Sequence, residues 1–167
     1  MRKLLPAVCL ALCVLSAHAD EPLSLQLDTT LSPSPALMTR ALDGAQATLD
    51  AALGYLGIRY RRGGSSPETG FDCSGFVRHV FNESVGRVLP HSAAAISKEG
   101  TRVEKAELQP GDLVFFNTMR KAFSHVGIYL GDSLFVHAPR SGGQVRIEDM
   151  TDRYWSRRYN GARRVAL

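Results

Sequence analysis

Cysteine is scarce in this chain of 167 residues, which has only three. Cys9 and Cys13 lie in an apolar segment at the N-terminus, so Cys73 is the only cysteine outside that segment. Outside that segment, close-spaced pairs of cysteine or histidine, which are typical of structural zinc sites, are also missing. A lone thiol has no partner for an intramolecular disulfide, so Cys73 is either buried and inert or retained for its reactivity.

A hydrophobic run long enough to cross a membrane is missing as well. The apolar stretch of residues 4–15 is too short, because a membrane-spanning helix needs about 20 such residues. Arg2 and Lys3 precede it, and residues 17–19 (Ala-His-Ala) follow it with the small residues that signal peptidase recognises. We therefore predict a cleavable signal peptide over residues 1–19 and no stable membrane insertion after cleavage. An uncleaved anchor is the alternative.

A large excess of either charge sign is also absent. The formal net charge is +4 at pH 7, and removal of Arg2 and Lys3 lowers it by two. This charge is too small to indicate nucleic acid as a partner. A late group of arginines is either solvated surface or a region with affinity for a carboxylate-bearing polymer. The group consists of Arg153, Arg157, Arg158, Arg163 and Arg164.

The apolar pattern divides the remaining chain. Residues 20–38 contain scattered prolines without a steady period, which predicts a flexible tether before a single domain over residues 39–167. Apolar residues at spacings of three and four predict an amphipathic helix from Ala36, with Gly57 as its C-cap. Its apolar face would consist of Met38, Leu42, Ala45, Leu49, Leu53 and Leu56.

Two more helices are predicted, over residues 73–83 and 92–98, and strands follow them. Beyond residue 100 the apolar residues alternate with polar ones, which is typical of strands. The predicted strands are residues 112–117, 124–130, 134–138, 144–148 and 162–166. Helices that precede strands without alternating with them indicate an α+β domain with an antiparallel sheet.

Two histidines on neighbouring predicted strands can share one face of that sheet. Within residues 124–130 the alternation places His125 away from the apolar face, on the same side as Gly127. A three-residue loop, residues 131–133, would pair Gly127 with His137 and bring His125 diagonally next to it. A two-residue loop would send the histidines to opposite faces.

The residues around Cys73 favour a reactive thiol. Small and polar residues precede an apolar run, so the sulfur should lie at a helix N-terminus, where the helix dipole lowers the pKa of a thiol. One of the two histidines could act as a base and form a thiolate–imidazolium pair with this thiol, and the other could orient the base. Two alternatives remain open: the three side chains hold zinc, or the histidines are ordinary half-buried residues.

Five blocks stand in order along the chain: residues 60–64 (YRRGG), 71–77 (FDCSGFV), 110–116 (PGDLVFF), 125–131 (HVGIYLG) and 135–139 (FVHAP). These collinear blocks closely resemble the NlpC family of bacterial cell-wall cysteine peptidases, over about residues 40–167. The resemblance implies a papain-like fold, with N-terminal helices packed on a C-terminal antiparallel sheet. It also implies hydrolysis of amide bonds in the peptide stems of peptidoglycan.

Residue by residue, the resemblance implies that Cys73 is the nucleophile, His125 the general base and His137 the group that orients His125. We predict no cofactor and no metal.

The resemblance also implies roles beside the nucleophile. Tyr60 matches a tyrosine that lies against the active site, and Asp72 and Ser74 match positions that line the substrate groove. Simpler roles stay open, because Asp72 could be only a helix N-cap and Tyr60 only core packing. His91 stands where many relatives carry arginine, which leaves the substrate contacts of its loop open.

The resemblance leaves the scissile bond undecided. Family members cleave either the D-alanyl–diaminopimelate cross-link or the D-glutamyl–diaminopimelate bond within one stem. A single catalytic domain behind a signal peptide resembles the small periplasmic cross-link endopeptidases, so we predict cross-link cleavage. A thiol amidase or acyltransferase with the same triad and a non-catalytic wall-binding module are the alternatives. We expect a monomer, periplasmic or secreted, with peptidoglycan stems as its partner.

Overall fold

The computed structural model of the protein describes residues 34–140 and 143–166. The predicted signal peptide, residues 1–19, lies outside the described residues, as does most of the predicted tether, residues 20–38. The last four residues of that tether form the first turn of a helix instead. No helix of the described residues is both long and apolar enough to cross a membrane.

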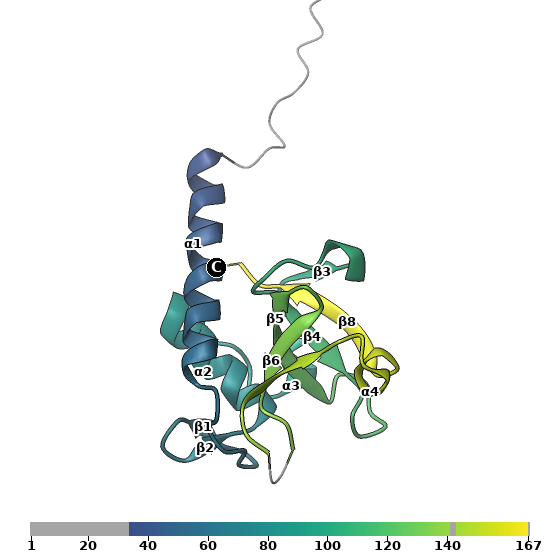
Figure 1. Ribbon diagram of the computed structural model, residues 1–167. Helices are drawn as coiled ribbons and strands as arrows, with labels where there is room; N and C mark the ends of the chain where they lie inside the picture. Colours follow the sequence, from purple (N-terminus) through teal and green to yellow (C-terminus); the bar gives the residue numbers. More distant parts are fainter. Residues whose placement is uncertain (1–33, 141–142, 167) are drawn as a thin grey trace, which may run out of the picture. The chain divides into compact units, whose positions relative to one another are not determined.

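The helices of the described residues are α1 (Pro35–Gly54), α2 (Cys73–Val85), α3 (Ala93–Ile96) and α4 (Arg153–Ser156), with a short 3-10 helix, η2 (Lys105–Glu107) (Figure 1). The helices predicted over residues 73–83 and 92–98 are confirmed, the second as a single turn. The first helix ends before Gly57, the predicted cap, and is closed by Tyr55. Helix α4 was not predicted, because four residues are too few to show a helical period.

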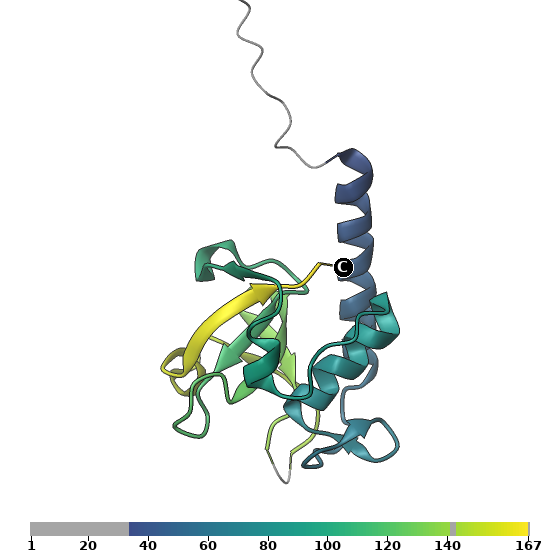
Figure 2. The same ribbon diagram turned by 180° about the vertical axis from the view of Figure 1, so that it is seen from behind.

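Helix α1 buries only part of the face that the sequence predicted. Its buried residues are Thr48 and Ala52, whereas Met38 and Leu42 are 59% and 66% exposed. Residues 34–43 are exposed throughout, and Figures 1 and 2 both show this part of α1 extending past α2. The predicted apolar face is therefore buried only in the C-terminal half of the helix, where Leu49 packs against the core, and the prediction was wrong for Met38 and Leu42.

The strands form two antiparallel sheets. They are β1 (Ser65–Ser66) with β2 (Gly70–Phe71), and a six-stranded sheet of β3 (Thr101–Val103), β4 (Leu113–Phe116), β5 (His125–Gly131), β6 (Leu134–His137), β7 (Arg146–Asp149) and β8 (Tyr159–Arg164). The large sheet has the order β3-β8-β4-β5-β6-β7, so the last strand is inserted between β3 and β4. The predicted α+β class with an antiparallel sheet is confirmed.

Buried side chains cover both faces of the large sheet. On one face, Phe115 and Val126 pack in a cluster with Phe76 of α2. On the other face, Phe116 packs with Trp155 of α4. Successive residues of a strand point to opposite faces, which is why the neighbours Phe115 and Phe116 serve different clusters. Helices α1 and α2 lie on the same side of the sheet, and α2 contacts β5 (Figures 1 and 2).

The hairpin of β5 and β6 has the predicted register. Ile128 is paired with Val136, and this register places Gly127 opposite His137. The β-carbon of His137 would lie 3.2 Å from a β-carbon at Gly127, in agreement with that pairing. His125 and His137 therefore lie on the same face of the sheet, as predicted.

The turn of this hairpin differs from the predicted three-residue loop. Gly131 pairs with Leu134, so only Asp132 and Ser133 form the turn, with φ angles of 49° and 65°. Positive φ at both positions is what a two-residue hairpin turn requires. The register shifts between Tyr129 and Gly131, and the one extra residue of this bulge restores the shared face that a regular two-residue hairpin would have lost.

The close approach of β5 and β6 at Gly127 leaves no room for a side chain. A β-carbon there would lie 2.7 Å from the ring of Phe135 and 2.9 Å from the carbonyl oxygen of Val136. We expect Gly127→Ala to lower the free energy of unfolding by about 1–3 kcal/mol through overpacking. Gly54→Ala is the matched control, because a β-carbon there meets nothing within 4 Å. Equal thermal midpoints for the two variants would contradict this packing.

Candidate active site

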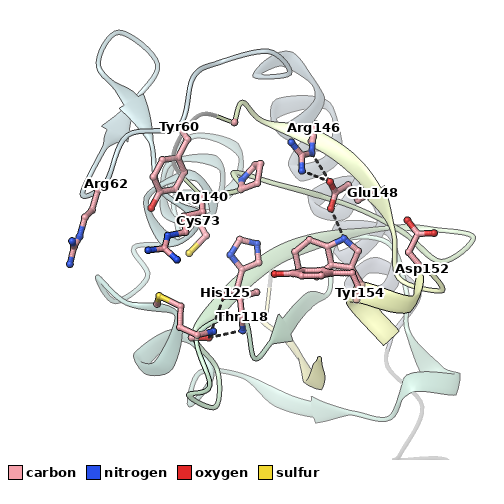
Figure 3. A pocket seen from close by; sticks show the side chains of 15 residues that line it. Tyr60, Arg62, Cys73, Thr118, His125, Arg140, Arg146, Glu148, Asp152 and Tyr154 are labelled. Carbon is pink, nitrogen blue, oxygen red and sulfur yellow. Dashed lines mark hydrogen bonds and ion pairs between the residues drawn. The ribbon is translucent and has the colours of Figure 1, made fainter. Parts of the chain in front are cut away.

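A cleft of about 820 Å³ contains both Cys73, at the start of α2, and His125, at the start of β5. Residues of β7 and α4 also line it. Figure 3 shows the side chains of Cys73 and His125 pointing toward each other in this cleft. Cys73 is a half-buried free thiol. The structure thus brings together the thiol and the imidazole that the sequence predicted as partners.

The position of Cys73 is fixed by the cap of α2. Oδ1 of Asp72 accepts from the backbone N–H of Gly75 at 2.7 Å, so Asp72 is the N-cap. Ser74 is 7% exposed and donates to Asp72 at 3.0 Å and to the carbonyl of His91 at 3.1 Å. Neither Asp72 nor Ser74 is among the residues that line the cleft. Both hold the helix start in place, and their predicted contact with substrate stays a prediction.

Tyr60 does line the cleft. Burial raises the pKa of its hydroxyl, and nearby Cys73 and Asp72 raise it further, while Arg62 and Arg140 lower it. The hydroxyl therefore keeps its proton at neutral pH and can donate a hydrogen bond into the cleft. The predicted role of Tyr60 beside the substrate stays a prediction.

The pKa of Cys73 is raised to about 11, so the predicted lowering was wrong. Burial of the thiol is the largest cause, and the negative charge of Asp72 adds to it. Nearby backbone groups of Val126 and Ser74 act in the opposite direction but are outweighed. A thiolate in this position would lose its hydration and lie near the carboxylate of Asp72. Together these two effects destabilise the thiolate by more than the helix N-terminus stabilises it. Cys73 is therefore a protonated thiol at pH 7.

His125 is kept neutral by its surroundings. It is 6% exposed, and burial, followed by the effect of His137, lowers its pKa to about 3, with Glu148 acting in the opposite direction. The resting site therefore pairs a neutral thiol with a neutral imidazole. The predicted thiolate–imidazolium pair is not the resting state, because both ions would be buried.

These pKa directions predict how Cys73 reacts with iodoacetamide. Only the thiolate is alkylated, and below the pKa of the thiol the thiolate fraction grows about tenfold per pH unit. The rate of alkylation of Cys73 should therefore rise about tenfold per pH unit between pH 6 and pH 9, without a plateau. Asp72→Asn keeps an N-capping side chain but removes the charge, and it should speed alkylation at each pH. Mass spectrometry of the Cys73 peptide measures both rates. A pH-independent rate near pH 6 would instead indicate a preformed ion pair.

His137 lies directly behind His125, on the neighbouring strand. Nε2 of His125 and Nδ1 of His137 are 2.7 Å apart, which is a hydrogen-bond distance. His137 is fully buried. Because this bond occupies Nε2 of His125, the Nδ1 atom is the ring nitrogen left to face Cys73. The arrangement is the one that the sequence predicted for a base and its orienting group.

Two residues that the sequence analysis missed complete the surroundings of the histidines. Oε2 of Glu148 lies 3.3 Å from Nε2 of His137, and the indole N–H of Trp155 donates to that same oxygen. The ring of Trp155 stacks on His125 with centroids 5.5 Å apart. Trp155 is the only tryptophan of the chain, and Glu148 ends a predicted strand, but neither belongs to a motif that would have marked it.

Two of the late arginines have separate partners within the fold. Arg164 pairs with the buried Asp112 at 2.8 Å, and Arg158 lies over the ring of Tyr154. None of the five lines the cleft. The arginines that do line it are Arg62, Arg140 and Arg146.

The zinc alternative does not fit the geometry. The facing nitrogens of His125 and His137 point at each other across a hydrogen bond rather than at a common point where an ion could sit. In the part of the chain that the structure describes, no group of three or more His, Cys, Asp or Glu side chains is arranged to hold a metal ion.

A cysteine at a helix start that faces a histidine on an antiparallel sheet defines a papain-like α+β domain, the class that the sequence predicted. The chain belongs to the NlpC/P60 family, whose family model matches residues 57–164. The collinear blocks of sequence had indicated this family.

Individual relatives agree with this assignment. The chain is 42% identical over 128 residues to the murein DD-endopeptidase MepS/murein LD-carboxypeptidase of Escherichia coli (strain K12), which covers 77% of this chain and 66% of that protein. It is 42% identical over 111 residues to the gamma-DL-glutamyl hydrolase of Bacillus subtilis (strain 168). That alignment covers 66% of this chain and 27% of the hydrolase. A crystal structure of an NlpC/P60 family protein from Bacillus cereus ATCC 10987 superposes with a TM-score of 0.68 at 34% identity. The superposition covers 74% of this chain and 40% of that protein. The chain thus spans less than two thirds of the length of each.

Proposed function

We propose that this protein is a cysteine endopeptidase that hydrolyses amide bonds in the peptide stems of peptidoglycan. The observation that carries the proposal is the free thiol of Cys73 facing His125 in an open cleft, with His137 hydrogen-bonded behind the base. Two neutral histidines buried side by side are costly to a fold, which favours a chemical purpose for them. The names of the murein hydrolases among its relatives support the substrate class.

The first half of the reaction forms a thioester. Since thiol and imidazole are both neutral at rest, Nδ1 of His125 takes the thiol proton as the Cys73 sulfur attacks the peptide carbonyl carbon. The carbonyl oxygen becomes an oxyanion, which the first backbone N–H groups of α2 and the hydroxyl of Tyr60 can stabilise. The imidazolium of His125 then gives its proton to the leaving amine, and the carbon–nitrogen bond breaks.

The second half restores the enzyme. His125, again neutral, accepts a proton from a water molecule that attacks the thioester carbonyl. The carbon–sulfur bond breaks, the acid product leaves, and the proton returns from His125 to the sulfur of Cys73. The low pKa of His125 keeps this ring unprotonated at rest, and it makes the imidazolium a strong acid toward the leaving amine.

The charge of the cleft suits the proposed substrate. Three arginines (Arg62, Arg140 and Arg146) and two carboxylates (Glu148 and Asp152) line it, so positive charge is in excess, and stem peptides carry carboxylates that arginine binds well. Arg62 and Arg140 both act on the hydroxyl of Tyr60, which places positive charge beside the proposed oxyanion site.

Among the stem bonds, we propose the D-alanyl–diaminopimelate cross-link. The relative named as a murein DD-endopeptidase aligns with a larger share of this chain, 77%, than the relative named as a gamma-DL-glutamyl hydrolase, 66%. Cleavage of the D-glutamyl–diaminopimelate bond is the second candidate, favoured by the equal identity of that relative, 42%. The thiol amidase or acyltransferase would use the same residues, and the assembled thiol–imidazole site speaks against a non-catalytic wall-binding module.

The proposed substrate sets the compartment. Peptidoglycan lies outside the cytoplasm, so we propose that the protein acts in the periplasm or after secretion, as a monomer with the stem peptides as its partner. This agrees with the signal peptide that the sequence predicts over residues 1–19.

Digestion of purified peptidoglycan tests the proposal. The protein is incubated with intact sacculi, and the fragments that a muramidase later releases are identified by mass spectrometry. We expect cross-linked dimers to decrease and uncross-linked monomers with intact stems to increase. Stems shortened to the dipeptide would identify the D-glutamyl bond instead, and an unchanged fragment pattern would reject the proposed activity.

A further inference from the structure

A carboxylate stands behind the two buried histidines. Strands β5, β6 and β7 are neighbours in the sheet, and each contributes one side chain to the same face: His125, His137 and Glu148. Glu148 is paired with Phe135, two residues before His137 on the adjacent strand, which places it diagonally next to His137. The line of side chains therefore runs across three strands, away from Cys73.

Each oxygen of Glu148 has a defined partner. Oε1 accepts from Nε of Arg146 at 2.6 Å, and Oε2 accepts from the indole N–H of Trp155. Nε2 of His137 lies 3.3 Å from Oε2 and has no hydrogen bond of regular geometry with any described residue. A buried ring nitrogen that carries a proton needs an acceptor, and the carboxylate of Glu148 is placed to supply it. Figure 3 shows the side chains of Glu148 and Arg146 next to each other at the cleft.

These contacts determine where the protons sit. The close contact with His137 is the largest cause that lowers the pKa of Glu148, to about 2, so Glu148 is ionised and can only accept. Burial lowers the pKa of His137, so this ring is neutral and carries one proton. A proton on Nε2 of His137, facing Glu148, leaves its Nδ1 as an acceptor.

The same reasoning continues to the base. Nδ1 of His137 is 2.7 Å from Nε2 of His125, so the single proton of His125 must lie on Nε2. Nδ1 of His125 is then unprotonated, and this is the atom left to face Cys73. If His137 carried its proton on Nδ1 instead, Nε2 of His125 would have to accept that hydrogen bond, and the proton of His125 would lie on Nδ1. A protonated Nδ1 cannot accept the thiol proton.

We infer that Glu148 is a positioning residue that fixes the tautomers of His137 and His125, and so keeps the basic nitrogen of His125 directed at Cys73. The inference rests on the proposed function for its kinetic consequence, but the tautomers themselves exist whether or not the protein cleaves peptidoglycan. Glu148 acts through His137 and touches neither the thiol nor the base.

Nitrogen-15 NMR of the full chain with labelled histidine tests the inference without any substrate. In the wild type at pH 7, His125 and His137 should both carry their proton on Nε2. Glu148→Leu removes the acceptor, and His137 should then populate the Nδ1–H tautomer. Glu148→Gln keeps an acceptor oxygen without charge and should retain the wild-type tautomers in part. Asp149→Asn is the matched control, because Asp149 is the next residue of β7 and bonds to Thr151 instead.

The kinetic readout separates positioning from support of the fold. With a soluble cross-linked muropeptide dimer, Glu148→Leu should lower kcat by about 10–100-fold, the range found when a carboxylate that orients a metal-bound histidine is lost. KM should change by less than about threefold, and Glu148→Gln should recover part of kcat. If Glu148 only supports the fold, the thermal midpoint will fall while kcat and the tautomers of the folded fraction stay those of the wild type.

A wild-type spectrum with the His137 proton on Nδ1 would overturn the inference at once. So would Glu148→Leu with unchanged tautomers and kcat. If Glu148→Leu does not fold, the wild-type spectrum and Glu148→Gln decide the matter. A protein with the expected tautomers but no hydrolysis would reject the proposed function and leave the role of Glu148 standing.

Discussion

Replacing Cys73 with alanine is expected to reduce hydrolysis of purified peptidoglycan by about 10⁴-fold or more, to the background rate. The reason is that the reaction proceeds through a covalent thioester, and no other thiol lies in the described residues to form it. Soluble fragments released from sacculi per unit time measure the effect.

The fold should survive this substitution. The cap of α2 uses the side chain of Asp72 and the backbone of Gly75, and no atom of the thiol takes part. Near-ultraviolet circular dichroism and the thermal midpoint of Cys73→Ala should therefore match the wild type. An active Cys73→Ala variant, or inhibition of the wild type by a chelator, would contradict the cysteine mechanism and favour a metal-dependent one.

Replacing His125 with alanine should have nearly the same effect as replacing Cys73. His125 both removes the thiol proton and protonates the leaving amine, and a thiol with a pKa of about 11 is a weak nucleophile without that base. We expect a loss on the order of 10³–10⁴-fold, close to that of Cys73→Ala.

The double variant tests whether the two residues act as a unit. Cys73→Ala combined with His125→Ala should be no slower than Cys73→Ala alone, because groups that work together are not additive. His79→Ala is the matched control, since His79 lies on α2 but does not line the cleft. Additive losses, or an equal loss in His79→Ala, would show that His125 is not the partner of the thiol.

Local patterns predicted much of this fold. The helix that begins at Cys73, its N-cap Asp72 and the face shared by His125 and His137 all depend on residues close in sequence. The hairpin shows the limit of such reasoning. Its register was predicted, yet it arises from a two-residue turn with a bulge, and a bulge leaves no reliable mark in the alternation of apolar residues.

The failures share a physical cause, which is that burial depends on the assembled fold. Met38 and Leu42 have helical spacing, but no element covers them among the described residues, so they are exposed. The helix start would lower the pKa of Cys73, yet burial and the charge of Asp72 decide its direction. Glu148 is 11 residues from His137 in sequence and becomes its neighbour only when β7 pairs with β6.

Titration of the native protein with iodoacetamide tests the central claim, that the Cys73 thiol is the nucleophile, most directly. At pH 9, where alkylation is fast enough to follow, samples are taken over time. Each is assayed for hydrolysis, and peptide mass mapping gives the fraction of Cys73 that is modified. We predict that the remaining activity equals the unmodified fraction of Cys73 at every point. Full modification of Cys73 with activity retained would contradict the account.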